Sequence, residues 1–144
     1  MEEAVKEAEE VLRLIRKYNV KVTFPIAFDW ENVEEAEVSG SRTRKEVYDY
    51  SVLMDCARAF CRTIEAAGYT PIVYTNLWTF NRGYDPSLLE DYDLWLANYT
   101  DIANGIYTNF KYNYQIWQYS FKGNVSGIGT AVDMDIAFVN YAKK

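Results

Sequence analysis

Histidine is absent from this sequence of 144 residues. This absence removes the most frequent metal ligand and the usual base that activates serine or cysteine nucleophiles. Cysteine occurs only as Cys56 and Cys61, five positions apart in a segment with a helical pattern, so the two side chains point in different directions and do not favour a disulfide. Any catalysis must therefore use carboxylates, tyrosine, lysine or the substrate itself.

Basic charge and long apolar runs are also lacking. The chain has 15 Lys and Arg against 21 Asp and Glu, a net charge of −6. It therefore offers no basic face to nucleic acid or to an anionic membrane. No run of about 18 apolar residues exists, and the N-terminal MEEAVKEAEE is acidic and helical, so the chain as given predicts neither a membrane span nor a signal peptide.

Apolar and aromatic residues, by contrast, are plentiful. The chain is 49% hydrophobic and 17% aromatic, with 13 Tyr and 4 Trp. This length and composition suit one domain, spanning residues 1–144, with a sizeable core. The aromatic content suits carbohydrate or peptide recognition and equally suits a packed core.

Periodicity predicts an α/β domain that starts with a largely parallel sheet. Helical patterns cover 2–18 and 44–67, with Ser41 or Thr43 as an N-cap and Gly68 as a C-cap signal. Short β-branched and aromatic runs predict strands at 22–28, 70–76, 94–99, 114–120 and 130–135, although Pro25 fits poorly in the first. We also expect a short helix between the second and third strands and a closing helix after Asp135, with that residue as its N-cap.

Two acids end the first apolar run, FPIAFDWEN at 24–32. Side chains alternate along a strand, so Asp29 and Glu31 point the same way, with Cα atoms about 6.5–7 Å apart. Neighbouring carboxyls beside apolar residues raise each other's proton affinity, which suits glycosidic cleavage. The pattern alone is common and equally describes a solvated strand end or an Asp29 cap on the next turn.

Several segments taken together resemble glycoside hydrolase family 25, the lysozymes of the N-acetylmuramidase type. They occur in the family's order: DWE, AAGY, PIVYTN followed by Trp78, LWLANY, YQIWQYS and GNVSGIGTAVDMDIAF. The resemblance implies a distorted barrel of about eight strands and about five helices. It also implies cleavage of the β-1,4 bond between N-acetylmuramic acid and N-acetylglucosamine in peptidoglycan.

The resemblance further assigns roles to acids. Glu31 looks like the general acid, and Asp29 looks like the partner that holds the substrate's 2-acetamido group as that group attacks the anomeric carbon, so no protein nucleophile is needed. Asp133 resembles a late acid of the family, or is a turn residue. Asp135 stands where the family often has Asn, and we interpret it as a cap.

Aromatic residues on the predicted strands are candidates for stacking on sugar rings or closing the acetamido pocket, or belong to the core. They are Tyr74, Trp95, Tyr99, Trp117 and Tyr119, of which Tyr74 and Trp117 are favoured for the cleft. Trp30 should point away from the acids, into the layer between sheet and helices.

The family resemblance starts at the helix before the family's fourth strand. The chain therefore corresponds to roughly the C-terminal two-thirds of the family domain, an incomplete TIM-like (β/α) barrel of about five strands with flanking helices. Open sheet edges predict weak or no activity of the isolated chain, or a homodimer formed through these edges.

Three functions follow from these patterns. The first is a peptidoglycan hydrolase acting on glycan chains outside the cell or in the wall, without a cofactor. The second is a non-catalytic module that binds peptidoglycan or another glycan. The third is an acidic α/β scaffold for another ligand. We expect no metal, because the acids do not stand at regular offsets in one loop.

Overall fold

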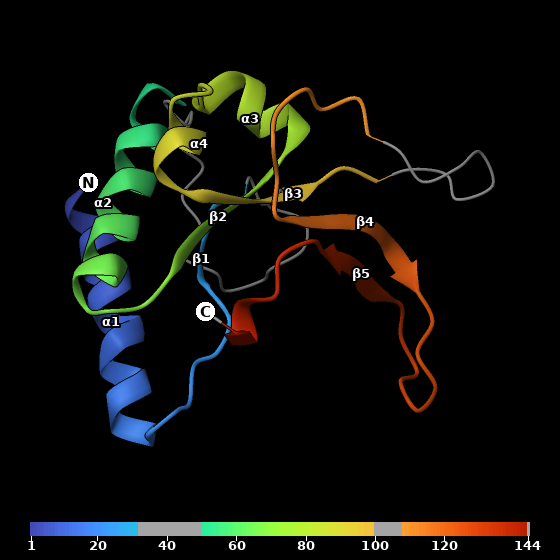
Figure 1. The fold of residues 1–144 in the computed structure, drawn as a ribbon, viewed down its shortest axis with the longest axis horizontal. Helices are drawn as coiled ribbons and strands as arrows, with labels where there is room; N and C mark the ends of the chain where they lie inside the picture. The colour runs from blue at the N-terminus through green and yellow to red at the C-terminus, as the bar shows by residue number, and fades with distance from the viewer. Residues whose placement is uncertain (32–49, 100–107, 144) are drawn as a thin grey trace, which may run out of the picture.

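The computed structural model describes residues 1–31, 50–99 and 108–143, which fold around one five-stranded sheet. The strand order is the chain order, β1 to β5, and the sheet curls into half a barrel with helices on its outer side (Figure 1). The strands are β1 (Ile26–Asp29), β2 (Pro71–Asn76), β3 (Asp93–Ala97), β4 (Ile116–Gly123) and β5 (Val132–Ala137). This arrangement confirms the predicted α/β class and the incomplete TIM-like barrel.

Strands β1 to β4 are parallel, and β5 returns antiparallel to β4. Strand β1 is shorter than the predicted 22–28 and begins directly after Pro25. Proline has no N–H to donate to a ladder, so regular pairing starts one residue later, where Ile26 N donates to Thr70 O at 2.9 Å. The strand ends on Asp29, which places this acid at the carboxyl edge of the sheet.

Two helices pack together beside the sheet. Helix α1 (Glu2–Tyr18) buries Ala4, Ala8 and Leu12, a stripe at helical spacing, and it contacts α2 (Leu53–Ala66). A 3-10 turn, η1 (Tyr50–Val52), leads into α2. The predicted start of this helix at 44–49 and both candidate caps, Ser41 and Thr43, lie outside the described residues. Gly68 follows α2 with φ +86°, the left-handed conformation that the C-cap signal predicted.

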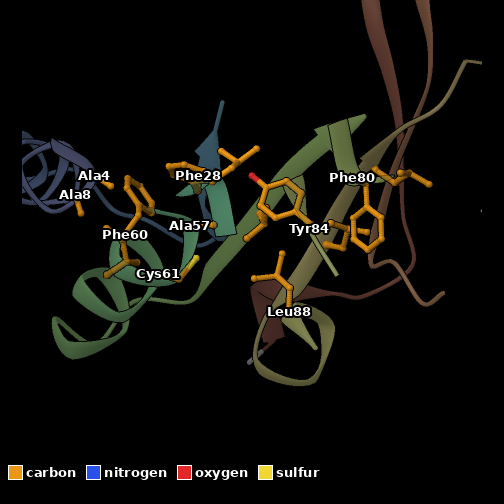
Figure 2. Packing of buried hydrophobic residues seen from close by; sticks show 14 of the residues in the cluster. Ala4, Ala8, Phe28, Ala57, Phe60, Cys61, Phe80, Tyr84 and Leu88 are labelled. Carbon is orange, nitrogen blue, oxygen red and sulfur yellow. The ribbon is translucent and has the colours of Figure 1, made fainter. Parts of the chain in front are cut away.

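The main core lies between the outer face of the sheet and the helices. Figure 2 shows Phe28 of β1 facing Phe60 and Ala57 of α2, with the two phenyl centroids 5.4 Å apart. Burial raises the pKa of the neighbouring Cys61 thiol to about 12, so this side chain stays protonated and acts as a small apolar group.

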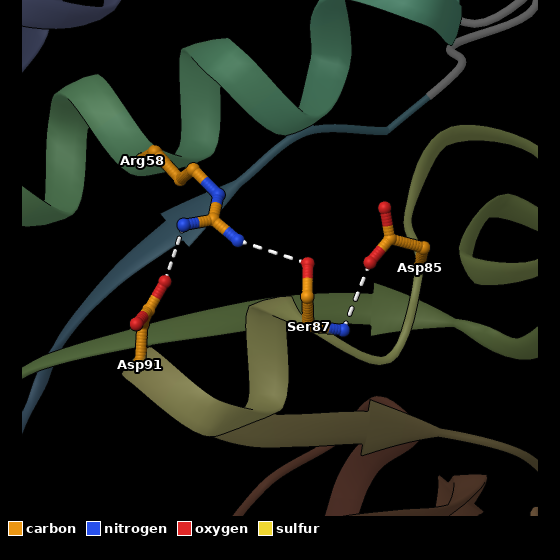
Figure 3. Close-up of polar contacts among 4 residues, drawn as sticks. All are labelled: Arg58, Asp85, Ser87 and Asp91. Carbon is orange, nitrogen blue, oxygen red and sulfur yellow. Dashed lines mark hydrogen bonds and ion pairs between the residues drawn. The ribbon is translucent and has the colours of Figure 1, made fainter.

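The predicted helix between β2 and β3 is two short helices, α3 (Leu77–Gly83) and α4 (Leu88–Asp91). Asn76 caps α3 by accepting a hydrogen bond from Thr79 N at 2.8 Å. Arg58 connects α2 to α4, since it donates a hydrogen bond to Ser87 Oγ at 3.1 Å and forms an ion pair with Asp91 (Figure 3).

The expected closing helix is wrong. Strand β5 continues to Ala137, and only a 3-10 turn, η3 (Tyr141–Lys143), follows. Residues 132–137 alternate in burial, so the two-residue period of a half-buried strand prevails over helix propensity. Asp135 therefore lies within a strand and caps no helix. Tyr141 instead packs on the inner face of the sheet against Ile72 and Ile116.

Candidate active site

The acids and several aromatic residues meet on the inner face of the half-barrel. Asp29, Tyr74 and Trp95 are Cα partners across β1, β2 and β3, so their side chains stand side by side on one face. Gln118 of β4 joins them, because its Oε1 accepts a hydrogen bond from the Tyr74 hydroxyl at 3.0 Å. The alternate residues face the helices.

A buried hydrogen-bond network connects this face to Glu31. Tyr74 and Gln118 are 7% and 5% exposed, and the hydroxyl of Tyr99 donates to the same Gln118 Oε1 at 2.9 Å. The Tyr74 hydroxyl also lies close enough to Glu31 to lower the pKa of that carboxyl. Tyr74 has one hydroxyl proton, and it donates this proton to Gln118.

Both strand-end acids hold protons more tightly than ordinary carboxyls. Partial burial raises the pKa of Asp29. Partial burial also raises the pKa of Glu31, and the negative charges of Asp29 and Asp133 add to this effect, while the hydrogen bond from Tyr74 opposes it. Both residues are exposed, so a ligand can reach each carboxyl despite this partial desolvation.

The late acids come from β5. The field of Asp133 acts on Glu31, Tyr99 and Asp135, which places Asp133 near the strand-end pair. Asp135 lies opposite Gln118, and its Oδ1 accepts a hydrogen bond from Trp95 Nε1 at 2.7 Å. Partial burial raises the pKa of Asp135, and this hydrogen bond opposes the increase.

Trp117 does not join this group. It is next to Gln118 in β4 and so points to the opposite face, where it is 3% exposed and donates from Nε1 to Asn98 O at 2.9 Å. Tyr119 accompanies it, with ring centroids 6.1 Å apart. Trp30 packs against the outer core and contacts Tyr50 edge to face. The structure therefore brings Tyr74, Trp95 and Tyr99 to the acids, and leaves Trp117 and Tyr119 elsewhere.

Gln118 was not predicted from the sequence as a site residue. Its only signal is a polar residue between Trp117 and Tyr119 in an otherwise apolar and aromatic run, which marks a side chain that points to a polar interior. Among the described ranges, no three acidic or cysteine side chains come together in an arrangement that could hold a metal ion. Likewise, no helix in the described part of the chain has the length and hydropathy of a membrane span.

Comparison with known proteins shows the family of this chain. The model for "Glycosyl hydrolases family 25" matches residues 1–128. No curated protein sequence matches significantly. Among solved structures, the modular autolysin LytC from Streptococcus pneumoniae is 26% identical with a TM-score of 0.67, and the match covers 92% of this chain and 30% of that one. The LytC complex with a synthetic peptidoglycan ligand gives 25% identity with the same TM-score and the same two coverages.

The catalytic domain of endolysin ply40, from bacteriophage P40 of Listeria monocytogenes, shares the fold at 20% identity, with a TM-score of 0.64 over 99% of this chain and 64% of that one. This chain thus spans less than two-thirds of each of these solved chains. The family match covers most of the present sequence, from the first helix through the hairpin between β4 and β5. The chain belongs to glycosyl hydrolases family 25.

Proposed function

We propose that this chain is a peptidoglycan muramidase in which Glu31 is the general acid. The observation that carries the proposal is the placement of Glu31 and Asp29 beside Tyr74 on the inner face, where partial burial and the charges of Asp29 and Asp133 raise the pKa of Glu31. A raised pKa favours the protonated form of the carboxyl, which protonation of a glycosidic oxygen requires. Family membership and the peptidoglycan ligand of LytC support this choice of substrate.

The second acid acts on the substrate. Asp29 accepts a hydrogen bond from the 2-acetamido N–H, which orients the acetamido oxygen toward the anomeric carbon as the glycosidic bond breaks. The proton of Glu31 goes to the leaving oxygen, and the resulting carboxylate then takes a proton from the water that opens the cyclic intermediate. Tyr74 and Asp133 border the same space, where Tyr74 stabilises the Glu31 carboxylate and Asp133 favours its reprotonation.

Hydrolysis of purified cell walls tests this proposal. Wild-type chain should release new reducing ends, slowly because its open sheet edges predict weak activity, and borohydride reduction should identify these ends as N-acetylmuramic acid. Glu31→Gln should lower the rate by about 10²–10⁴-fold, the usual contribution of general acid catalysis. Glu90→Gln, a change at an exposed carboxyl on α4, is the matched control and should leave the rate unchanged. Reducing ends on N-acetylglucosamine, or full activity of Glu31→Gln, would refute the assignment.

Glycan binding without hydrolysis is the second candidate. The five described strands keep the aromatic inner face, although this chain spans less than two-thirds of the solved relatives. A binding module would sediment with cell walls, would do so equally well as Glu31→Gln, and would release no reducing ends as wild type. Either activity would be exerted on the cell wall, outside the cytoplasmic membrane.

We also propose that two copies pair through a sheet edge. In the described residues β1 pairs only with β2, and because Ile26 N points to β2, the N–H groups of Ala27 and Asp29 point to the open edge. Ala27→Pro removes one of these outward donors and keeps the ladder to β2. Sedimentation equilibrium should show a wild-type dimer and an Ala27→Pro monomer; a wild-type monomer at millimolar concentration would exclude the pairing.

A further inference from the structure

Two exposed aromatic rings form a ridge next to the acid site. Tyr99 and Phe121 are 48% and 47% exposed, and their ring centroids are 4.8 Å apart at an interplanar angle of 56°. Tyr99 follows β3, and Phe121 lies in the part of β4 that runs toward the β4–β5 hairpin (Figure 1). Large apolar surface left open to water beside a polar site is typical of a binding surface.

Tyr99 connects the ridge to the acid site. The Tyr99 hydroxyl donates to Gln118 Oε1, which also accepts from Tyr74, the partner of Glu31. Partial burial raises the pKa of Tyr99, and the charges of Asp133 and Glu31 contribute. The hydroxyl end of Tyr99 thus lies in the field of the acids, while its ring reaches Phe121. A sugar next to the cleaved bond would meet this ridge.

A cation stands at the far end of the ridge. Lys122 Nζ lies 4.9 Å from the centroid of the Phe121 ring. Lys122 is exposed, and within the described ranges it forms no ion pair. The acid site itself disfavours anions, because the charges of Asp29 and Asp133 act on Glu31 and the charge of Asp133 acts on Asp135. An anionic group on the substrate is therefore accommodated best at the Lys122 end.

We infer that Tyr99, Phe121 and Lys122 form a carbohydrate subsite beside the acid pair, in which the rings stack on a sugar and Lys122 pairs with a carboxylate carried by that sugar. This inference rests on the proposed function for its substrate class. Peptidoglycan supplies such a carboxylate from two sources, the lactyl ether of N-acetylmuramic acid and the stem peptide attached to it. The subsite makes the protein prefer muramyl glycans to neutral chitin oligomers.

Calorimetric titration of three tetrasaccharides tests the subsite: chitotetraose, an alternating N-acetylglucosamine and N-acetylmuramic acid tetramer without peptide, and the same tetramer with its stem peptides. All variants carry Glu31→Gln so that the ligands stay intact. Phe121→Ala should weaken binding of all three by about fivefold, the scale of one lost ring contact. Lys122→Gln should reduce the preference for the muramyl ligands by about threefold, as expected for an exposed ion pair.

Phe138→Ala is the matched control, because Phe138 is 58% exposed and lies after β5, in contact with Tyr114 instead of the ridge. It should bind all three ligands like its parent. A preference already present for the peptide-free tetramer identifies the lactyl carboxylate, and a preference confined to the peptide-bearing tetramer identifies the stem; both support the subsite. Circular dichroism of each variant confirms that the fold is intact.

Three results would overturn the inference: no binding of any ligand, equal behaviour of Phe121→Ala and Phe138→Ala, or a muramyl preference that survives Lys122→Gln. Hydrolysis of cell walls by the chain with Glu31 intact separates this outcome from the proposed function. If the chain hydrolyses cell walls but the ridge variants bind normally, the proposed function is supported and the subsite is refuted. If binding depends on the ridge but no reducing ends are released, the subsite is supported and the proposed function is refuted.

Discussion

The two faces of the sheet are built from alternate residues of the same strands, yet they differ in chemistry. On the outer face, Phe28, Val73 and Leu94 are at most 4% exposed and pack under the helices. On the inner face, Tyr74 and Gln118 are nearly as buried, but their polar side chains hydrogen-bond each other, and the Tyr74 hydroxyl lowers the pKa of Glu31. The outer face therefore supplies most of the folding free energy, and the inner face holds the proton-binding groups.

The largest predicted difference is between two buried isoleucines, one in the core on the outer side of the sheet and one on its inner face. Ile64 of α2 and Ile72 of β2 are 0% and 1% exposed. Ile64→Ala should lower the free energy of unfolding by about 3–4 kcal/mol, because the large outer core cannot collapse around the cavity. Ile72→Ala should cost about 2 kcal/mol, since partly exposed neighbours such as Trp95 relax into the space. Urea unfolding measures both, and an equal or larger cost at Ile72 would contradict the comparison.

Two buried tyrosines offer a finer test. Tyr74 and Tyr84 are 7% and 8% exposed, but the Tyr84 hydroxyl has no hydrogen-bond partner among the described residues. Tyr74→Phe should cost about 1 kcal/mol, because it removes the hydrogen bond to Gln118, and it should raise the pKa of Glu31, because it removes the hydroxyl that lowers this pKa. Tyr84→Phe should be neutral or stabilising and should leave the Glu31 pKa unchanged.

NMR titration of the Glu31 side-chain carboxyl carbon reads the pKa in both variants. If Glu31 is the general acid, the alkaline limb of hydrolysis should move to higher pH in Tyr74→Phe by the same amount. An unchanged or lower Glu31 pKa in Tyr74→Phe, or an equal rise in Tyr84→Phe, would contradict the effect assigned to the inner-face hydroxyl.

The smallest predicted effect is a gain in stability when one acid is removed. The folded state raises the pKa of Asp29, so it binds a proton more tightly than the unfolded chain, and stability falls as pH rises from the ordinary carboxyl pKa through the raised one. Asp29→Asn avoids this loss and should raise Tm by about 1–2 °C at pH 7. The difference should disappear below about pH 3, where Asp29 is protonated in both states.

Glu90→Gln serves again as the control in this experiment, because Glu90 is exposed on α4, and its Tm should follow wild type at all pH values. A lower Tm for Asp29→Asn at pH 7 would mean that the carboxylate of Asp29 is stabilised in the folded chain, in opposition to the desolvation that raises its pKa.

Much of the fold was predictable because local signals agree with the tertiary structure. The apolar stripe of α1, the Gly68 stop of α2 and the β-branched runs of β2 and β3 each specify one element. The end of the chain was not predictable from propensity. The local sequence after Asp135 favours a helix, but pairing with β4 extends β5 to Ala137 instead.

The site was predictable only in part. The spacing of Asp29 and Glu31 fixes their common face, and register then brings Tyr74 and Trp95 beside them. Sequence could not tell which face of β4 meets the acids, because an aromatic residue suits both. The assignment of Trp117 to the cleft therefore stays a prediction, and the structure places this side chain on the opposite face, where it hydrogen-bonds Asn98 O. The neighbouring Gln118 instead accepts the hydrogen bond from Tyr74 on the inner face.

The most direct test of the account is the pKa of Glu31 in the wild-type chain, measured by the carboxyl carbon titration described above. We expect a pKa above that of an ordinary glutamate, which moves down toward the ordinary value in Asp29→Asn because a neighbouring negative charge is lost. A wild-type value at or below that of an ordinary glutamate, unchanged by Asp29→Asn, would contradict a coupled acid pair on the inner face.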